Sequence, residues 1–189
     1  MSGTTQLPTA ARSLDPLDPG VSNVLVLSSS LDPPAAPAPV RLLGTTDRPL
    51  VYVALTRRDL THLDRWLTTA DPGVDVRLVD ATPGDRSSGP DVPGPSVAAP
   101  DALTDLGVGI SEALTAVGPD PACSFRSLTA LRQYVGRRRA YRFLNAAVDR
   151  TEANAAVACY SADPRALADR DVHAFASLFD AVHDCRDDG

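Results

Sequence analysis

Three cysteines and three histidines are the residues of this chain best suited to metal binding or nucleophilic catalysis. Cys123, Cys159, Cys185 and His183 could ligate zinc, but their spacing contains no C-x-x-C pair. Cys123 and Cys159 also fall in apolar stretches typical of buried strands, where a thiol behaves as a small apolar side chain. We therefore predict no metal site and no bound cofactor.

Two other arrangements of polar residues could carry chemistry. His62, His173 and His183 could join serine and aspartate in a hydrolase triad, but no G-x-S-x-G elbow is present to expose a nucleophile. Asp80 follows a predicted strand and could bind a ribose, but no G-x-G-x-x-G follows the first predicted strand. We expect the histidines to occupy scattered surface and boundary positions.

Arginines form the densest charged group in the chain. Seven lie between residues 126 and 150, opposed only by Asp149: Arg126, Arg132, Arg137, Arg138, Arg139, Arg142 and Arg150. On helices, five of them would form a patch that suits an acidic protein or a nucleic-acid backbone, namely Arg132, Arg137, Arg138, Arg139 and Arg142. The alternative is a solvated helix face whose arginines pair with the chain's own aspartates. Of the two partners, an acidic protein is preferred.

The composition excludes several classes of function. The chain has 189 residues and a net charge of -6, and all 18 basic residues are arginine, so it has no Schiff-base or phosphate-loop lysine. A pI of about 4.9 removes the overall positive charge of a typical nucleic-acid-binding protein. Aspartate in excess without lysine fits the salt-loaded cytoplasm of a halophilic archaeon, or simply a GC-rich genome. Neither explanation bears on function.

The apolar runs are short, which bears on localisation. None approaches the ~18 residues of a membrane span, and residues 1–20 carry no secretory signal. We therefore expect a cytoplasmic protein with no membrane contact. The sequence leaves open whether the chain forms a homo-oligomer.

The spacing of apolar residues predicts an α/β fold of a single domain. Strands are predicted at 23–29, 50–55, 74–79 (near a sheet edge), 122–125 and 155–160, and helices at 58–70, 102–117, 128–135 and 137–151. Asp101 is the predicted N-cap of the second helix, and residues 179–183 either extend a last helix or form a last strand. Strands that alternate with helices imply a three-layer parallel sheet flanked by helices. A disordered tail (1–20), a loop rich in proline and glycine (82–100) and a short tail (185–189) complete the organisation.

Four segments, read in order, resemble the core of RecA/KaiC-type ATPases. They are NVLVLSSSLDPP, PLVYVALTRRDLTHLDRWL, SFRSLTALRQYVGRRRAYRFLNAAVDR and SADPRALADRDVHAFASLFDAVHD, and the resemblance covers roughly residues 21–184. More narrowly, the chain is similar to small relatives from halophilic archaea that lack a phosphate loop, some of them described as halobacterial transducer-like (HTR-like). The resemblance implies a RecA/KaiC-like core and a role in signalling or transcriptional control.

The residues that make such a core an ATPase are replaced in this chain. Where active relatives have the loop G-x-x-x-x-G-K-[ST], residues 28–34 read SSSLDPP, with no glycine, no lysine and two prolines that lack N–H donors. The metal-side acid before the Ser-Leu-Thr run is replaced by Arg126, which could contact an anion or be a surface or salt-bridged arginine. The catalytic glutamate after the second strand is missing from Thr56-Arg57-Arg58. We therefore expect neither ATP binding nor ATP hydrolysis.

Three hypotheses follow for the function. The first is a non-catalytic regulatory or signalling protein, a pseudo-ATPase with a protein partner. The second is a nucleic-acid-associated protein that acts through the basic stripe Arg126–Arg150. The third is a small enzyme with an unrecognised site.

Overall fold

The computed structural model describes residues 20–28, 48–84 and 89–185. Apart from Gly20 and Cys185, the two predicted tails lie outside these ranges, as does most of the segment 28–34 that replaces the phosphate loop.

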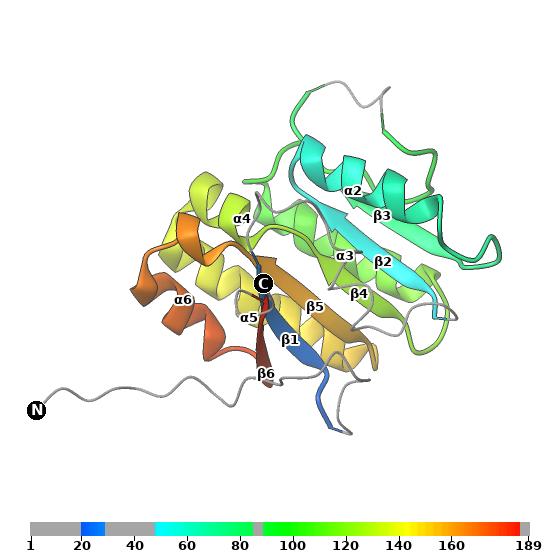
Figure 1. The fold of residues 1–189 in the computed structure, drawn as a ribbon. Helices are drawn as coiled ribbons and strands as arrows, with labels where there is room; N and C mark the ends of the chain where they lie inside the picture. The colour runs from blue at the N-terminus through cyan, green and yellow to red at the C-terminus, as the bar shows by residue number, and fades with distance from the viewer. Residues whose placement is uncertain (1–19, 29–47, 85–88, 186–189) are drawn as a thin grey trace, which may run out of the picture.

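The described strands form one parallel sheet, which confirms the predicted fold class (Figure 1). The order across the sheet is β3-β2-β4-β5-β1-β6, and every pair of neighbours is parallel. The strands are β1 (Asn23–Leu27), β2 (Leu50–Ala54), β3 (Val76–Asp80), β4 (Ala122–Phe125), β5 (Val157–Ala162) and β6 (Ala181–Asp184). Strands with apolar residues at nearly every position can be buried on both faces, which is why they occupy a sheet covered by helices.

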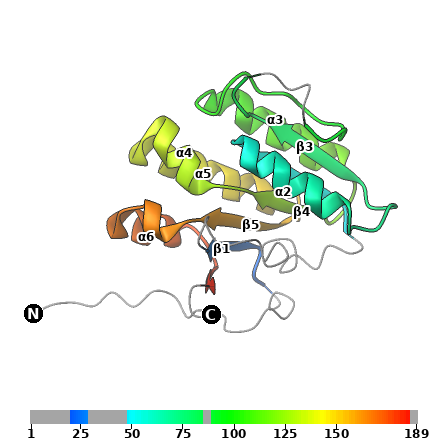
Figure 2. The same ribbon diagram turned by 45° about the horizontal axis from the view of Figure 1, so that its top comes forward.

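Helices cover both faces of the sheet and make three layers. They are α2 (Arg57–Leu67), α3 (Leu103–Ala116), α4 (Leu128–Val135), α5 (Arg137–Ala153) and α6 (Asp169–Ala176), with a short 3-10 turn at Pro164–Ala166. In the view of Figure 1, α2 lies in front of the sheet and α3, α4 and α5 lie behind it. The turned view shows α6 toward the β1 end, away from β3 (Figure 2).

Alternation along each strand divides the apolar side chains between two cores. In β1, Leu25 and Leu27 join the core under α3, α4, α5 and α6, whereas Val24 and Val26 face the layer of α2. In the larger core, the rings of Phe125 and Tyr160 stack with their centroids 5.8 Å apart.

The ends of several elements differ from the sequence prediction. The predicted N-cap Asp101 is wrong: α3 begins at Leu103 after Ala102, which makes no side-chain capping bond. Asp101 lies one residue too early, and its carbonyl instead accepts the Leu103 N–H at 2.9 Å. The fifth strand begins at Val157 rather than 155, because Ala155 takes the left-handed conformation (φ 52°) in the turn after α5. The last helix ends at Ala176, and the strand alternative for residues 179–183 is confirmed, although β6 begins two residues later, at Ala181.

Part of the predicted loop at 82–100 is hydrogen-bonded to the sheet. Residues 93–97, which we call the edge strap, run along the outer edge of β3, the edge strand that the sequence predicted. Leu78 and Asp80 donate their backbone N–H groups to the carbonyls of Pro93 and Pro95, at 2.9 and 3.1 Å. The strap therefore satisfies a strand edge that would otherwise be open to pairing with another chain.

Candidate functional site

The strand order places a topological switch point at the carboxyl edge of the sheet, between β2 and β4. From β2 the chain proceeds to β3 on one side, and from β4 it proceeds to β5 on the other. In open α/β sheets, ligands bind where the connections of adjacent strands diverge in this way. The residues at this point are Leu55 and Thr56 after β2, and Arg126 after β4.

A capping box lies on the β2 side of this switch point. Asp59 is 4% exposed, and its Oδ2 accepts the backbone N–H groups of Leu55 and Thr56 at 3.0 and 2.9 Å. The Thr56 hydroxyl accepts from the Asp59 N–H in return, which completes the box and begins α2. Tyr52 donates its buried hydroxyl to the Asp59 carbonyl at 3.0 Å. Burial raises the pKa of the Asp59 carboxyl, although Arg126 and these hydrogen bonds act to lower it.

Arg126 carries the positive charge on the β4 side. Its backbone N–H donates to the Val53 carbonyl at 3.2 Å and so extends the pairing of β4 with β2 by one residue. Its Nε is buried and makes no hydrogen bond, and Arg126 forms no ion pair within the part of the chain that the structure describes. A salt-bridged role, one alternative raised by the sequence, is therefore not what the structure shows.

His62 on α2 lies in the field of these cations. Burial lowers the pKa of the His62 imidazole to about 4, helped by the charges of Arg126, Arg58 and Arg65. Because the imidazole stays neutral at pH 7, it adds no positive charge beside Arg126. His173 and His183 lie on α6 and β6, so the three histidines occupy three different elements.

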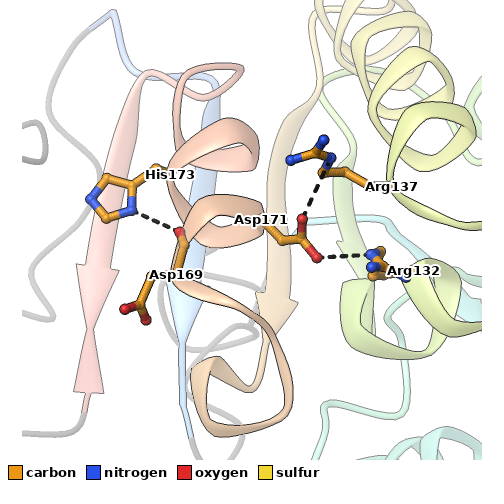
Figure 3. A network of polar contacts seen from close by, with 5 residues as sticks. All are labelled: Arg132, Arg137, Asp169, Asp171 and His173. Carbon is orange, nitrogen blue, oxygen red and sulfur yellow. Dashed lines mark hydrogen bonds and ion pairs between the residues drawn. The ribbon is translucent and has the colours of Figure 1, made fainter.

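The arginine patch predicted from the sequence divides into two parts. The first part belongs to a clamp around Asp171 of α6, whose side chain is 2% exposed (Figure 3). Its Oδ2 lies 2.8 Å from Arg132 Nε on α4, and its Oδ1 lies 3.7 Å from Arg137 Nε on α5. These two arginines therefore tie three helices together, as the internal-pairing alternative proposed. Beside the clamp, His173 Nδ1 lies 2.7 Å from the Asp169 carbonyl oxygen.

The second part of the patch is solvent-exposed. Arg138, Arg139 and Arg142 are exposed on the first two turns of α5, within about 100° of arc. We call these three residues the α5 arginine surface. Among the described residues, Arg138 and Arg142 form no ion pair, and Arg139 makes one long hydrogen bond (3.4 Å) to the Asp101 carbonyl. Arg150 lies apart from them, against Gly107 of α3.

The cysteines lie where the sequence predicted. Cys123 and Cys159 are buried in β4 and β5, and burial raises the pKa of the Cys123 thiol to about 12. Residues 20–28, 48–84 and 89–185 contain no group of three potential metal ligands from His, Cys, Asp and Glu. No helix in these ranges is long and apolar enough to cross a bilayer.

Sequence reasoning missed two of the groups described above. The capping box was readable, because Thr56-Arg57-Arg58-Asp59 has the spacing of a hydroxyl N-cap and an acid three residues later. The Asp171 clamp had no sequence signal, because Arg132 and Asp171 are 39 residues apart. Only the packing of α4 and of α6 against α5 brings the two together.

The layers and the strand order define the class: a three-layer α/β protein with an all-parallel sheet. Residues 21–184 match a family described as a family of unknown function (DUF7504), and the chain belongs to that family. It is also similar to a solved protein from Pyrococcus horikoshii OT3, which is described only as the subject of a structural study. The TM-score is 0.58 at 11% identity, over 89% of this chain and 83% of that one. At this identity the likeness shows the fold alone. A search among curated proteins found no match.

Proposed function

We propose that this chain is a non-catalytic regulatory or signalling protein of the cytoplasm. In this proposal it has a degenerate RecA/KaiC-like core and binds an acidic protein partner through the α5 arginine surface. The observation that carries the proposal is the exposed, unneutralised charge of Arg138, Arg139 and Arg142.

The position of these arginines on α5 supports a binding role over a stabilising one. Residues 137–139 form the first turn of the helix, which contains no acid and no capping side chain. Cations at a helix N-terminus oppose the helix dipole, at roughly 0.3–1 kcal/mol each. Arg137 is offset by Asp171, whereas Arg138 has no such partner among the described residues. An acidic surface docked here would relieve that repulsion.

Arg126 supports the loss of ATPase chemistry. The resemblance to RecA/KaiC cores assigns the metal-side acid to position 126, and the guanidinium there follows β4 at the carboxyl edge. A cation at that point repels Mg²⁺, and an arginine cannot ligate it.

Calorimetric titration tests the pseudo-ATPase part of the proposal. ATP, ADP and GTP are titrated with Mg²⁺ at the high salt suited to an acidic protein. We expect no binding tighter than about 100 μM, and a lower dissociation constant would contradict the proposal.

A charge-neutralising variant tests the partner part. The probe is a fluorescent polyglutamate peptide of roughly 20 residues, used at the lowest salt at which circular dichroism shows the native fold. We expect the double substitution Arg138→Gln, Arg142→Gln to weaken binding at least tenfold. The matched control, Arg65→Gln with Arg170→Gln, removes two exposed arginines outside α5 and should leave binding unchanged.

Two outcomes would count against an acidic protein partner. One is equal loss of peptide binding in the control and in the α5 variant, which would indicate a response to net charge alone. The other is tighter binding of a DNA duplex of roughly 20 base pairs than of the peptide, lost in the same α5 variant. That result would favour the nucleic-acid hypothesis.

A further inference from the structure

Two polar side chains lie side by side on the α2 face of the sheet, at its carboxyl edge. Phe125 of β4 pairs in register with Tyr160 of β5, and both rings belong to the core on the opposite face. The next residue on each strand, Arg126 and Ser161, therefore points toward the α2 face. Neighbouring strands are about 5 Å apart, so these two side chains start from adjacent positions.

Both side chains carry a buried polar atom without a partner. Ser161 is 6% exposed, and neither its Oγ nor the Arg126 Nε makes a hydrogen bond within the described part of the chain. Two residues before Arg126, and on the same face, the Ser124 Oγ also makes no hydrogen bond in the described part of the chain, and Ser124 is fully buried. Buried polar groups in proteins are almost always hydrogen-bonded, and a bound ion or water commonly explains the exceptions.

The charges around Arg126 leave it available to a ligand. Asp59 is the acid whose pKa Arg126 affects, yet its Oδ2 is occupied by two backbone N–H groups and it forms no ion pair with Arg126. His62 is neutral at pH 7, and Tyr52 donates its hydroxyl to the Asp59 carbonyl. An unpaired, partly buried guanidinium is costly, and an anion that accepts hydrogen bonds from it would remove that cost.

We propose that Arg126 and Ser161 form a binding site for a small oxyanion, a phosphate or a carboxylate, at the carboxyl edge between β4 and β5. The guanidinium supplies charge-assisted N–H donors, and the Ser161 hydroxyl supplies a further donor. Ser124, two residues before Arg126 on β4, adds a third polar side chain on the same face. This site goes beyond the proposed function, because it involves no residue of the α5 arginine surface.

Anion-dependent stability of the full chain provides the test. Inorganic phosphate and acetate are each compared with chloride at constant ionic strength and pH 7, by calorimetric titration and thermal unfolding. If the dissociation constant is about 1 mM, about 50 mM of the preferred anion should raise the unfolding midpoint by about 5 °C. We expect Arg126→Gln to weaken binding at least tenfold and Ser161→Ala about threefold. Arg170→Gln, which alters an exposed arginine outside the site, should bind like the unaltered chain.

The comparison of phosphate with acetate identifies which oxyanion the site prefers. Equal midpoints in phosphate, acetate and chloride for the unaltered chain would overturn the proposal. The same anion dependence in Arg126→Gln as in the unaltered chain would also overturn it. If Arg126→Gln fails to fold, Arg126→Lys preserves the charge but not the planar fork and should still bind at least threefold more weakly. A further readout needs no variant: the bound anion should slow hydrogen exchange of the Arg126 amide, and an unchanged rate would contradict the site.

Discussion

Replacing Asp171 by asparagine tests how the arginines of α4 and α5 are used. The Asp171 side chain is 2% exposed and holds Arg132 at 2.8 Å and Arg137 at 3.7 Å. The asparagine side chain would keep the volume but lose the charge, so each arginine would lose its anionic partner. We expect the variant to fold and to be measurably less stable.

The magnitude follows from the exposure and distance of each pair. The Arg132 hydrogen bond is short, with an arginine side chain 32% exposed, and a charged hydrogen bond of this kind contributes about 2 kcal/mol. The Arg137 side chain is 49% exposed and its contact is long, so it adds about 0.5 kcal/mol at most. Asp171→Asn should therefore cost about 2 kcal/mol. For a chain of this size the unfolding midpoint should fall by roughly 4–8 °C.

The two arginine variants should differ sharply. Arg132→Gln leaves a buried carboxylate with only a distant cation and should cost about 3 kcal/mol, more than the loss of Asp171 itself. Arg137→Gln should cost about 0.5 kcal/mol. Arg138→Gln, on the α5 arginine surface, should be neutral or slightly stabilising, because it removes a cation from a helix N-terminus.

Urea unfolding followed by circular dichroism gives the four free energies of unfolding directly. The expected order of destabilisation is Arg132→Gln, Asp171→Asn, Arg137→Gln and Arg138→Gln. Equal costs for the Arg132 and Arg137 variants would refute the reasoning from distance and exposure. A cost below about 0.5 kcal/mol for Asp171→Asn would show that the clamp contributes nothing to stability.

Three further predictions concern other parts of the fold. Gly94→Ala should detach the edge strap, because the φ of Gly94 is +153° and an added Cβ would overlap the Leu78 carbonyl oxygen. We expect the free energy of unfolding to fall by roughly 2 kcal/mol. Hydrogen exchange should show that the Leu78 backbone amide loses protection while the amides of β2 keep theirs. Thr151→Val should lower the free energy of unfolding in urea by about 1–3 kcal/mol, because the buried Asn23 Oδ1 loses the hydroxyl that donates to it at 2.7 Å. Thr151→Ser keeps the hydroxyl and should lower it less. Stability should fall as the pH drops from 6.5 to about 4, because the folded chain holds His62 neutral while the unfolded chain protonates it. The slope of unfolding free energy against pH should be smaller in His62→Gln, and an unchanged slope would show that His62 does not cause it.

The secondary structure was largely readable from the sequence, because its signals are local. The apolar runs at Val24–Leu27 and Leu50–Ala54, and the helical spacing across residues 103–116, depend only on neighbouring side chains. The errors were at element ends. Asp101 has the residue type of an N-cap, but the turn that precedes α3 places Ala102 at that position.

The candidate sites were readable only in part. The density of arginine between 126 and 150 is a property of the sequence, and it marked the stretch that carries both the clamp arginines and the α5 arginine surface. Which of these arginines pair with an acid was not readable, because Arg132 and Arg137 both contact Asp171, which lies 39 residues beyond Arg132. The edge strap was missed because its hydrogen bonds also come from another element. Its prolines and glycines have the composition of a free loop, but the strap carbonyls accept hydrogen bonds from β3.

By itself, the sequence determined the layered α/β architecture, the absence of lysine chemistry and the place where positive charge concentrates, because periodicity and composition are carried by residue types alone. Tertiary structure decided the rest. It divided the arginines into a clamp and an exposed surface, and it placed Arg126 beside Ser161 at the carboxyl edge of the sheet. These outcomes depend on strand register and helix packing, which join residues that no local pattern connects.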